Sequence, residues 1–252
     1  MSVILSFVFT MLLLLFGCAS DGPEGKTEAE ILYKEAQELV GSERYILATE
    51  KLQQIKTQHP YSYYATPAEL LLAEVQFKQE SFPEAAASFL LFRDFHPKHE
   101  RISYVIFMIG ESYYKQLPDT IDRDLSPGFE ALKFFDELMA RYPKAAEVED
   151  AKKRIEDINK KLREKDQYIA DFYFKTEAWE AARYWYIDIL TNHAREKELR
   201  EHAMVRTVAS SCQMKKWEEC LLYAEKFATL VDKKKAREIR SWETNCKNQK
   251  TR

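Results

Sequence analysis

The side chains that could perform chemistry are few, and their spacing does not match the patterns that catalysis requires. His96 and His99 stand three residues apart, a spacing that could place both on one helical face and hold a metal ion. They flank Pro97 in a turn, however, so we do not expect a metal site there. The 252 residues contain no Gly-rich phosphate loop, no GxSxG and no HExxH motif. The sequence therefore predicts neither an enzyme nor a bound cofactor or metal.

Cys18 is the residue whose surroundings point to a covalent modification. The apolar segment from Val3 to Phe16 is too short to span a bilayer, which needs about 20 residues, but it fits the core of a signal peptide. The segment ends in LFGC, which resembles a lipobox, the cleavage signal of bacterial lipoproteins. We therefore expect residues 1–17 to be a signal peptide and Cys18 to be the acylated N-terminus. Residues 18–28 would then form a flexible linker that tethers a domain to a lipid bilayer.

Three further cysteines, Cys212, Cys220 and Cys246, leave two interpretations open. An exported protein meets an oxidising compartment, so one disulfide could form and leave one thiol over. Buried free thiols are equally consistent, because Cys220 occupies a position that needs a small residue. Similarly, the Asp122-Arg123-Asp124 cluster could bind a cation or anchor its loop through salt bridges.

The composition favours helices as the elements that position these residues. Only 6 of the 252 residues are Gly, whereas nucleotide-binding α/β folds and β-barrels need Gly at their tight turns. Hydrophobic residues make up 46% of the chain and aromatic residues 13%, which is enough to bury a core between stacked helices. The tail from Lys233 to Arg252 carries a net charge of +6, which suits an anionic lipid surface, an acidic partner or a solvated terminal helix.

An internal repeat is the strongest signal in the chain. Each unit reads as two amphipathic helices, and the second carries a small residue, an apolar or aromatic residue four positions later, and a terminal proline. The pattern resembles the tetratricopeptide repeat, and it predicts an all-α superhelical solenoid of about five repeats with a C-terminal capping helix. In the second helices the small residues are Ala48, Ala85, Ala131, Ala182 and Cys220. In the first helices they are Ala36, Ala73, Gly110 and Ala170. A large residue stands three positions before the second-helix small residue at Tyr45, Phe82, Trp179 and Trp217.

The spacing of the repeats also predicts how the domain is organised. The third unit has nine extra residues, which we expect to fall in a loop over residues 118–127. A helical run without Gly or Pro extends from about Glu147 to Phe174 and could act as a rigid bridge. We expect one domain over residues 29–252, made of N-terminal units 29–97, an insert-bearing unit 98–143, and C-terminal units with a cap over 144–252.

Particular strings resemble one family. His96 to Gly110 reads HPKHERISYVIFMIG, the segment from Asp122 to Pro143 begins with DRD and ends with RYP, and Phe172 to Ala182 reads FYFKTEAWEAA. With the lipobox and the repeats, these strings are similar to the BamD family of outer-membrane assembly lipoproteins, over essentially the whole chain. Ala19, in place of Asp after the cysteine, favours the outer membrane by the same resemblance.

The resemblance implies a scaffold on the periplasmic side of the outer membrane. Its implied partners are the barrel-inserting component BamA, unfolded β-barrel precursors, and the bilayer through acylated Cys18; it implies no nucleic acid. The alternative is another periplasmic tetratricopeptide lipoprotein that serves as an envelope or cell-division adaptor. A cell-wall hydrolase is disfavoured, because five repeats and a cap leave no room for a catalytic domain.

Two sets of residues are candidate binding sites. Positions that line the concave groove of tetratricopeptide repeats would bind an extended, partly apolar peptide, although their rings could equally serve inter-helix packing. The family resemblance places the partner contact in the charged segment from Thr191 to Met204, near Arg200 and Glu201, where solvated helix positions are the plainer interpretation. The substrate-groove candidates are Tyr33, Gln37, Leu70, Glu74, Phe77, Tyr104, Phe107, Glu111 and Tyr114.

Overall fold

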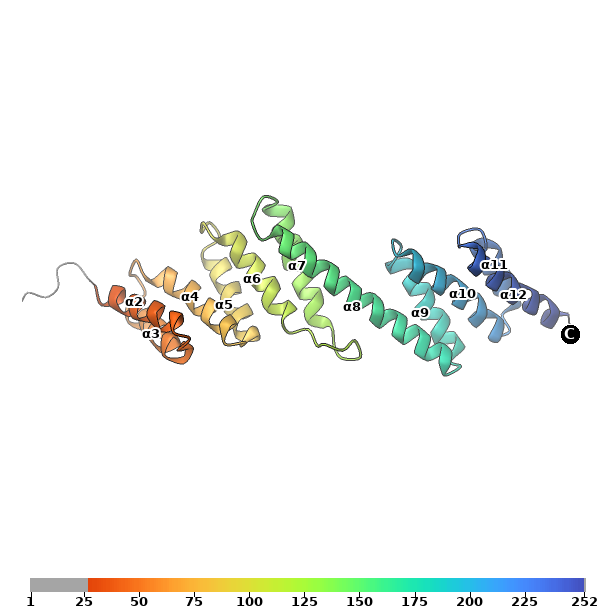
Figure 1. The fold of residues 1–252 in the computed structure, drawn as a ribbon, viewed down its shortest axis with the longest axis horizontal. Coiled ribbons are helices and arrows are strands. Elements are labelled where there is room, and N and C mark those ends of the chain that lie inside the picture. The colour runs from red at the N-terminus through yellow and green to blue at the C-terminus, as the bar shows by residue number, and fades with distance from the viewer. Residues whose placement is uncertain (1–26, 252) are drawn as a thin grey trace, which may run out of the picture. The chain divides into compact units, whose positions relative to one another are not determined.

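A computed structural model describes residues 27–251, which form eleven helices and no strand (Figure 1). The signal-peptide segment, Cys18 and most of the linker lie outside the described residues. The described chain divides into two compact units, one ending at Ser88 and the other starting at Phe89. The helices are α2 (Glu28–Gly41), α3 (Tyr45–Gln58), α4 (Ala65–Lys78), α5 (Phe82–Phe95), α6 (Ile102–Tyr114), α7 (Ser126–Arg141), α8 (Val148–Lys175), α9 (Trp179–Asn192), α10 (Lys197–Gln213), α11 (Trp217–Phe227) and α12 (Lys233–Lys250).

The small residues of the repeat are buried where helices pack closely, which confirms the all-α repeat fold. Ala36 of α2 and Ala48 of α3 are fully buried in the core of the first unit, together with Leu52 and Val75. The second unit repeats the arrangement: Ala170 of α8 and Ala182 of α9 are fully buried beside Tyr186. A larger side chain at the small positions would push the paired helices apart, so the spacing of small residues sets the spacing of helices.

In four of the repeats the large residue marks the start of the second helix. α3, α5, α9 and α11 begin at Tyr45, Phe82, Trp179 and Trp217. The prolines act at the other end: α3 ends two residues before Pro60, and α7 ends two residues before Pro143. α9 ends in the same way two residues before Ala194, so the repeat stops there without a proline.

The turn between the two helices of a repeat has one backbone conformation at four places. In the first repeat the chain reverses after α2 through hydrogen bonds from Glu43 N to Val40 O and from Arg44 N to Leu39 O, of 3.1 and 2.8 Å. This turn needs a residue in the left-handed region, where side chains with a Cβ are disfavoured. Each such residue stands five positions before the second-helix small residue: Glu43 (φ 59°), Glu80 (φ 60°), Glu177 (φ 60°) and Lys215 (φ 59°).

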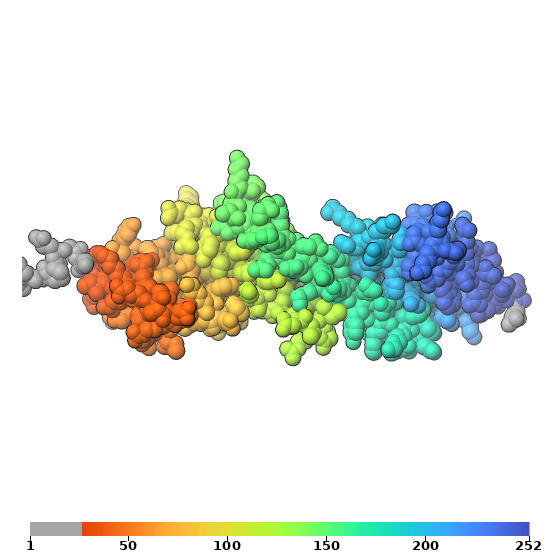
Figure 2. All heavy atoms as spheres, in the orientation of Figure 1, coloured from red at the N-terminus to blue at the C-terminus, as the bar shows by residue number. Residues whose placement is uncertain are grey.

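The insert of the third repeat is a loop held against α8. It spans residues 115–125, and α7 begins at Ser126 with Pro127 in its first turn, so the loop ends two residues earlier than the sequence predicts. Lys161 Nζ of α8 donates to the carbonyl oxygen of Pro118 at 2.9 Å, and Lys165 Nζ donates to that of Arg123. Lysine-to-carbonyl bonds thus anchor the loop, which projects beside α7 and α8 (Figures 1 and 2).

Candidate interaction surfaces

The first unit places four of its five candidate groove residues at or near the surface. Gln37 is exposed, whereas Tyr33, Glu74 and Phe77 are half-buried. The Tyr33 ring lies 5.6 Å from the ring of Tyr64, so part of its surface is used in packing. Leu70 is only 4% exposed. It belongs to the core, and its assignment to an open groove is wrong.

In the second unit the candidate groove residues are engaged with neighbouring helices. The Phe107 ring packs against the Phe135 ring of α7, with centroids 5.8 Å apart. The guanidinium of Arg101 stacks over the Tyr104 ring at 4.3 Å. Both rings are half-buried. The inter-helix packing that the sequence analysis left open is therefore part of their role.

Glu111 and Tyr114 join α6 to α8 through Arg154. Arg154 donates from Nε and Nη2 to the two carboxylate oxygens of Glu111, both at 2.9 Å, and its guanidinium lies 4.5 Å from the Tyr114 ring centroid. Glu111 is buried, so this paired bond satisfies a carboxylate that would otherwise be costly to desolvate. Burial, together with Asp157, raises the pKa of the Tyr114 hydroxyl. The structure thus gives Glu111 a structural partner and does not leave it to line an open groove.

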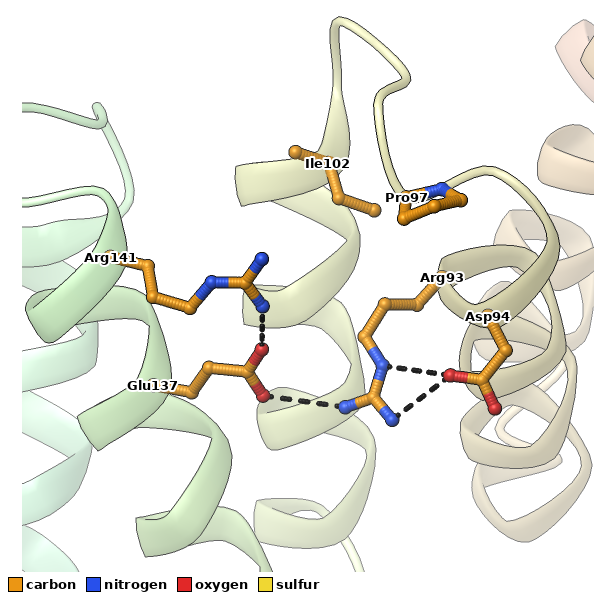
Figure 3. Close-up of a pocket in the computed structure, with 6 residues that line it drawn as sticks. All are labelled: Arg93, Asp94, Pro97, Ile102, Glu137 and Arg141. Atoms are coloured by element: carbon orange, nitrogen blue, oxygen red, sulfur yellow. Dashed lines mark hydrogen bonds and ion pairs between the residues drawn. The ribbon is translucent and has the colours of Figure 1, made fainter.

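Sequence reasoning missed a hollow lined by charged residues between α5, α6 and α7 (Figure 3). Its volume is about 530 Å³, and its lining residues are Arg93, Asp94, Pro97, Ile102, Glu137 and Arg141. Glu137 accepts from Arg93 Nη1 at 3.3 Å and from Arg141 Nη1 at 2.5 Å, while Arg93 Nη2 also reaches Asp94 at 3.1 Å. The two cations and two anions balance each other. The hollow therefore has no excess charge with which to capture an ion.

Exposed aromatic residues are a second feature that the repeat pattern did not predict. Tyr61 and Tyr63 lie in the loop between α3 and α4 and are 100% and 86% exposed. In the second unit Tyr184 of α9 is 66% exposed and forms the wall of a hollow of about 610 Å³ with Trp185. The YSYY string at residues 61–64, directly after Pro60, was a visible signal of these rings, although its last tyrosine, Tyr64, packs against Tyr33.

The two candidate partner-binding residues have different environments. Arg200 is half-buried at the start of α10, and its Nε atom is buried with no hydrogen-bond partner within residues 27–251. Glu201 is only 7% exposed and lies 4.0 Å from Lys197 Nζ. A protein partner could reach Arg200 and pair with its guanidinium. Glu201 is a buried carboxylate, so it cannot present its side chain on an open surface.

Asp171 of α8 is the centre of a polar cluster that joins α8, α9 and α10. Its Oδ1 atom accepts from Tyr186 Oη at 2.6 Å and lies 2.7 Å from His202 Nε2. Burial raises the pKa of this carboxyl, but the hydrogen bonds from His202 and Tyr186 outweigh burial and hold its pKa below the ordinary value. Burial likewise raises the pKa of Tyr186, which stays protonated as the donor. The cluster orients three helices near the charged start of α10.

α12 carries a row of cations beside its buried residues. Ile239 and Cys246 are buried, while Lys233, Arg237, Arg240 and Lys247 are exposed. Their spacing of four, three and seven residues places the four cations on one helical face. The basic tail of the sequence is therefore an ordered basic face.

Stacked antiparallel helix pairs with small residues at their contacts define the class: the protein has a tetratricopeptide-type, all-helical repeat fold. The family model described as outer membrane lipoprotein (YfiO) matches residues 25–219, so the chain belongs to that family. No helix within residues 27–251 is long and apolar enough to cross a membrane.

Curated relatives share the name outer membrane protein assembly factor BamD. The relative from Vibrio cholerae is 32% identical over 184 residues, which cover 67% of this chain and 74% of that protein. The relative from Neisseria gonorrhoeae is 28% identical over 68% of this chain and 70% of its own length. The relative from Rickettsia prowazekii is 28% identical over 75% of this chain and 76% of its own length.

Proposed function

We propose that this protein is a lipid-anchored scaffold for outer-membrane β-barrel assembly, which holds the barrel-inserting component BamA and unfolded barrel precursors and catalyses no reaction. The observation that carries the proposal is the family match over residues 25–219, whose relatives are named as assembly factors of outer membrane proteins. A helical solenoid supports it, because stacked helix pairs offer extended surfaces to other chains.

Depletion of the protein from cells tests this function. We expect the level of folded barrel proteins in the outer membrane to fall while the level of other outer-membrane lipoproteins is maintained, and re-expression to restore the barrels. Unchanged barrel levels after full depletion would contradict the proposal. A division defect with normal barrel levels would instead favour an envelope adaptor.

The anchor part of the proposal rests on Cys18, which follows a short apolar segment and precedes a polar linker. Cys18→Ala should release the protein from the membrane fraction, whereas Cys212→Ala, a matched cysteine change, should leave it there. Mass spectrometry of the wild-type protein should find acyl chains on Cys18. An unmodified chain that still begins at Met1 would show that Cys18 is not a lipid anchor.

Substrate binding is proposed for the first unit, where half-buried rings and a carboxylate share two helices. An extended precursor with an aromatic residue would pack on Tyr33 and Phe77 beside Glu74. Photocrosslinkers at these three positions should capture barrel-precursor peptides, and a crosslinker at exposed Tyr168 of α8 serves as the control. Capture at Tyr168 without capture in the first unit would contradict this placement.

Partner binding is proposed for the start of α10, and Arg200 is the residue that can reach a partner. A desolvated ion pair across an interface costs about 2–5 kcal/mol to break, so Arg200→Glu should abolish co-purification of BamA. Arg195→Glu makes the same charge change at an exposed neighbouring residue and should retain most of the binding. Full co-purification by the Arg200 variant at elevated salt would place the interface elsewhere, with the basic face of α12 next to test.

A further inference from the structure

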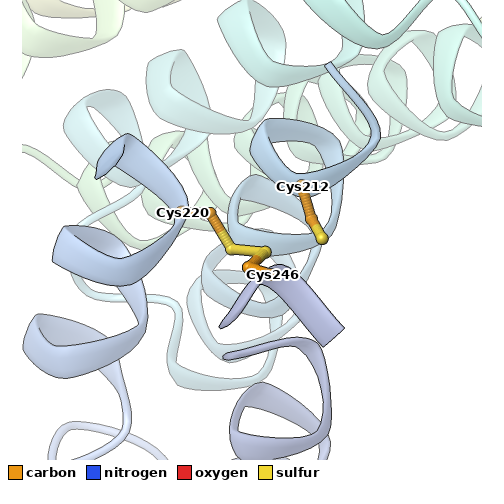
Figure 4. A group of neighbouring side chains, drawn as sticks. All are labelled: Cys212, Cys220 and Cys246. Carbon is orange, nitrogen blue, oxygen red and sulfur yellow. A yellow bond between two sulfur atoms is a disulfide. The ribbon is translucent and has the colours of Figure 1, made fainter. Parts of the chain in front are cut away.

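Three cysteines from three consecutive helices meet in the core of the second unit (Figure 4). Cys212 lies on α10, Cys220 on α11 and Cys246 on α12. Cys220 and Cys246 form a disulfide, and Cys212 is a free thiol. The three Sγ atoms all lie within 4.8 Å of one another, so the free thiol sits beside both sulfurs of the disulfide. This is the arrangement from which thiol–disulfide exchange proceeds.

The surroundings of the three cysteines favour sulfur–sulfur chemistry over metal binding. Apolar residues surround them, including Val208, Ala224, Phe227 and Ile239. Three thiolates around a divalent cation would leave a net charge of −1 in such a core, whereas a disulfide and a protonated thiol are neutral. Burial raises the pKa of the Cys212 thiol, which keeps it protonated most of the time and makes exchange slow.

We propose that Cys212 is an exchange thiol that moves the disulfide from the capping helix α12 onto α10. The Cys212 Sγ, as a thiolate, attacks Cys220 Sγ and forms the Cys212–Cys220 bond. The Cys220–Cys246 bond breaks, and Cys246 leaves as a thiolate that takes up the proton that Cys212 lost. One disulfide and one thiol are present before and after, so the step consumes no oxidant or reductant.

The two pairings differ in whether the capping helix is covalently held. α12 has 18 residues, yet Ile239 and Cys246 are its only buried ones. Trp242 of α12 packs, partly buried, against the same core, and the disulfide to α11 adds a covalent link to this contact. With the Cys212–Cys220 pairing, α10 and α11 are linked and α12 has no covalent tie. The cysteines thus define a cap-linked and a cap-free form of the second unit.

Disulfide mapping of the oxidised full chain tests the exchange directly. The folded protein is held at about pH 8, near the ordinary pKa of a thiol, then quenched with acid, alkylated without reduction and digested. The alkylating reagent marks the free thiol, so we expect it on Cys212 at the start. The fraction of Cys246 that is alkylated should then rise by as much as the alkylated fraction of Cys212 falls. Peptides that contain Cys18 are scored separately. Label confined to Cys212 at all times would overturn the proposal. Label moving to Cys220 would also overturn it, because α12 would then remain linked.

Two serine variants test the consequence for the capping helix. Treated with oxidised glutathione, Cys246→Ser should form the Cys212–Cys220 disulfide, and Cys212→Ser should keep Cys220–Cys246. Backbone amides of residues 233–250 should then exchange with solvent faster in Cys246→Ser than in Cys212→Ser. Two free thiols in Cys246→Ser, or equal exchange in the two variants, would contradict the cap-free form. The wild-type mapping decides the exchange even if Cys246→Ser folds poorly.

Discussion

Gly110 of α6 lies against the ring of Phe135 of α7, which leaves no room for a side chain at this position. A Cβ built at this position would meet Phe135 Cε1 at 2.6 Å and Cδ1 at 2.8 Å, and Phe135 is fully buried with no space to withdraw. We expect Gly110→Ala to lower the free energy of unfolding by about 1–3 kcal/mol, the usual cost of overpacking a core. Denaturant titration followed by circular dichroism measures the change.

Gly41 provides the matched control for this prediction. A Cβ at Gly41 meets nothing within 4 Å, and the residue ends α2. Gly41→Ala should therefore be neutral or slightly stabilising, because alanine is the better helix former. Equal effects of the two substitutions would show that the contact with Phe135 does not limit the size of residue 110.

Tyr186 and Asp171 form a hydrogen bond whose contribution should depend on pH. Tyr186→Phe removes the donor and should lower the free energy of unfolding by about 1 kcal/mol at neutral pH. The hydrogen bonds hold the pKa of Asp171 below its ordinary value, so their stabilisation is present above that value, about 3.9, and is lost as the pH falls through the lower folded-state pKa. The difference between wild type and variant should therefore shrink below about pH 4. An unchanged difference in acid would show that the ionised carboxylate is not the acceptor.

The repeated turn between paired helices has a glutamate or a lysine where a glycine would be less strained. Glu80 has a φ of 60° after α4, a conformation that costs a residue with a Cβ about 1 kcal/mol. Glu80→Gly should therefore stabilise the first unit by up to about 1 kcal/mol, as measured by thermal unfolding. Glu84→Gly makes the same substitution in the first turn of α5, where it should destabilise the first unit by a similar amount. Destabilisation by both variants would indicate that the Glu80 side chain makes contacts that outweigh its backbone strain.

The disulfide between α11 and α12 gives the C-terminal end of the second unit its own redox dependence. It closes a loop of 26 residues, for which the loss of unfolded-state entropy stabilises the fold by about 3 kcal/mol. Reduction of the disulfide should lower the free energy of unfolding of this segment by a similar amount. Faster hydrogen exchange of the backbone amides of α10 to α12 would show this loss. Protection of α2 to α4 in the same experiment serves as the control and should not change.

The elements were predictable from the sequence because their signals are local. Small residues twelve positions apart, a large residue at the starts of α3, α5, α9 and α11, and prolines after the helix ends predict most of the pairs; the run without Gly or Pro predicts the long α8. The candidate sites were less predictable, because they depend on which side chain a neighbouring helix covers. Leu70 and Glu201 have suitable positions on their helices but are buried, and the Arg93–Glu137–Arg141 hollow joins residues more than 40 positions apart. The choice among three cysteine pairings also required three-dimensional contacts.

At the scale of the whole molecule, the repeat architecture predicts that part of the chain can fold alone. Each helix pair packs mainly on its neighbours in sequence, so removal of one end leaves the contacts of the other in place. A fragment of residues 82–252 should keep the helicity per residue of the full chain and form the Cys220–Cys246 disulfide. A fragment that starts at Asn159 lacks the packing of α8 on α6 and α7 but keeps the cores around Tyr186 and around the cysteines, so it should also form this disulfide. Circular dichroism and thiol counting check the two outcomes, and an unfolded longer fragment would contradict nearest-neighbour stability.

The length of α8 has a mechanical consequence for the second unit. Its 28 residues extend about 42 Å at 1.5 Å per residue. Val148, Ala151 and Ile158 are buried near its start, and Ala170 is buried near its end against α9. A tilt of roughly 10° at the α6–α7 end would carry the α9 end through about 7 Å, more than one helical turn of about 5.4 Å. α8 is therefore a lever arm, through which small rotations at one set of helices become large displacements at the other.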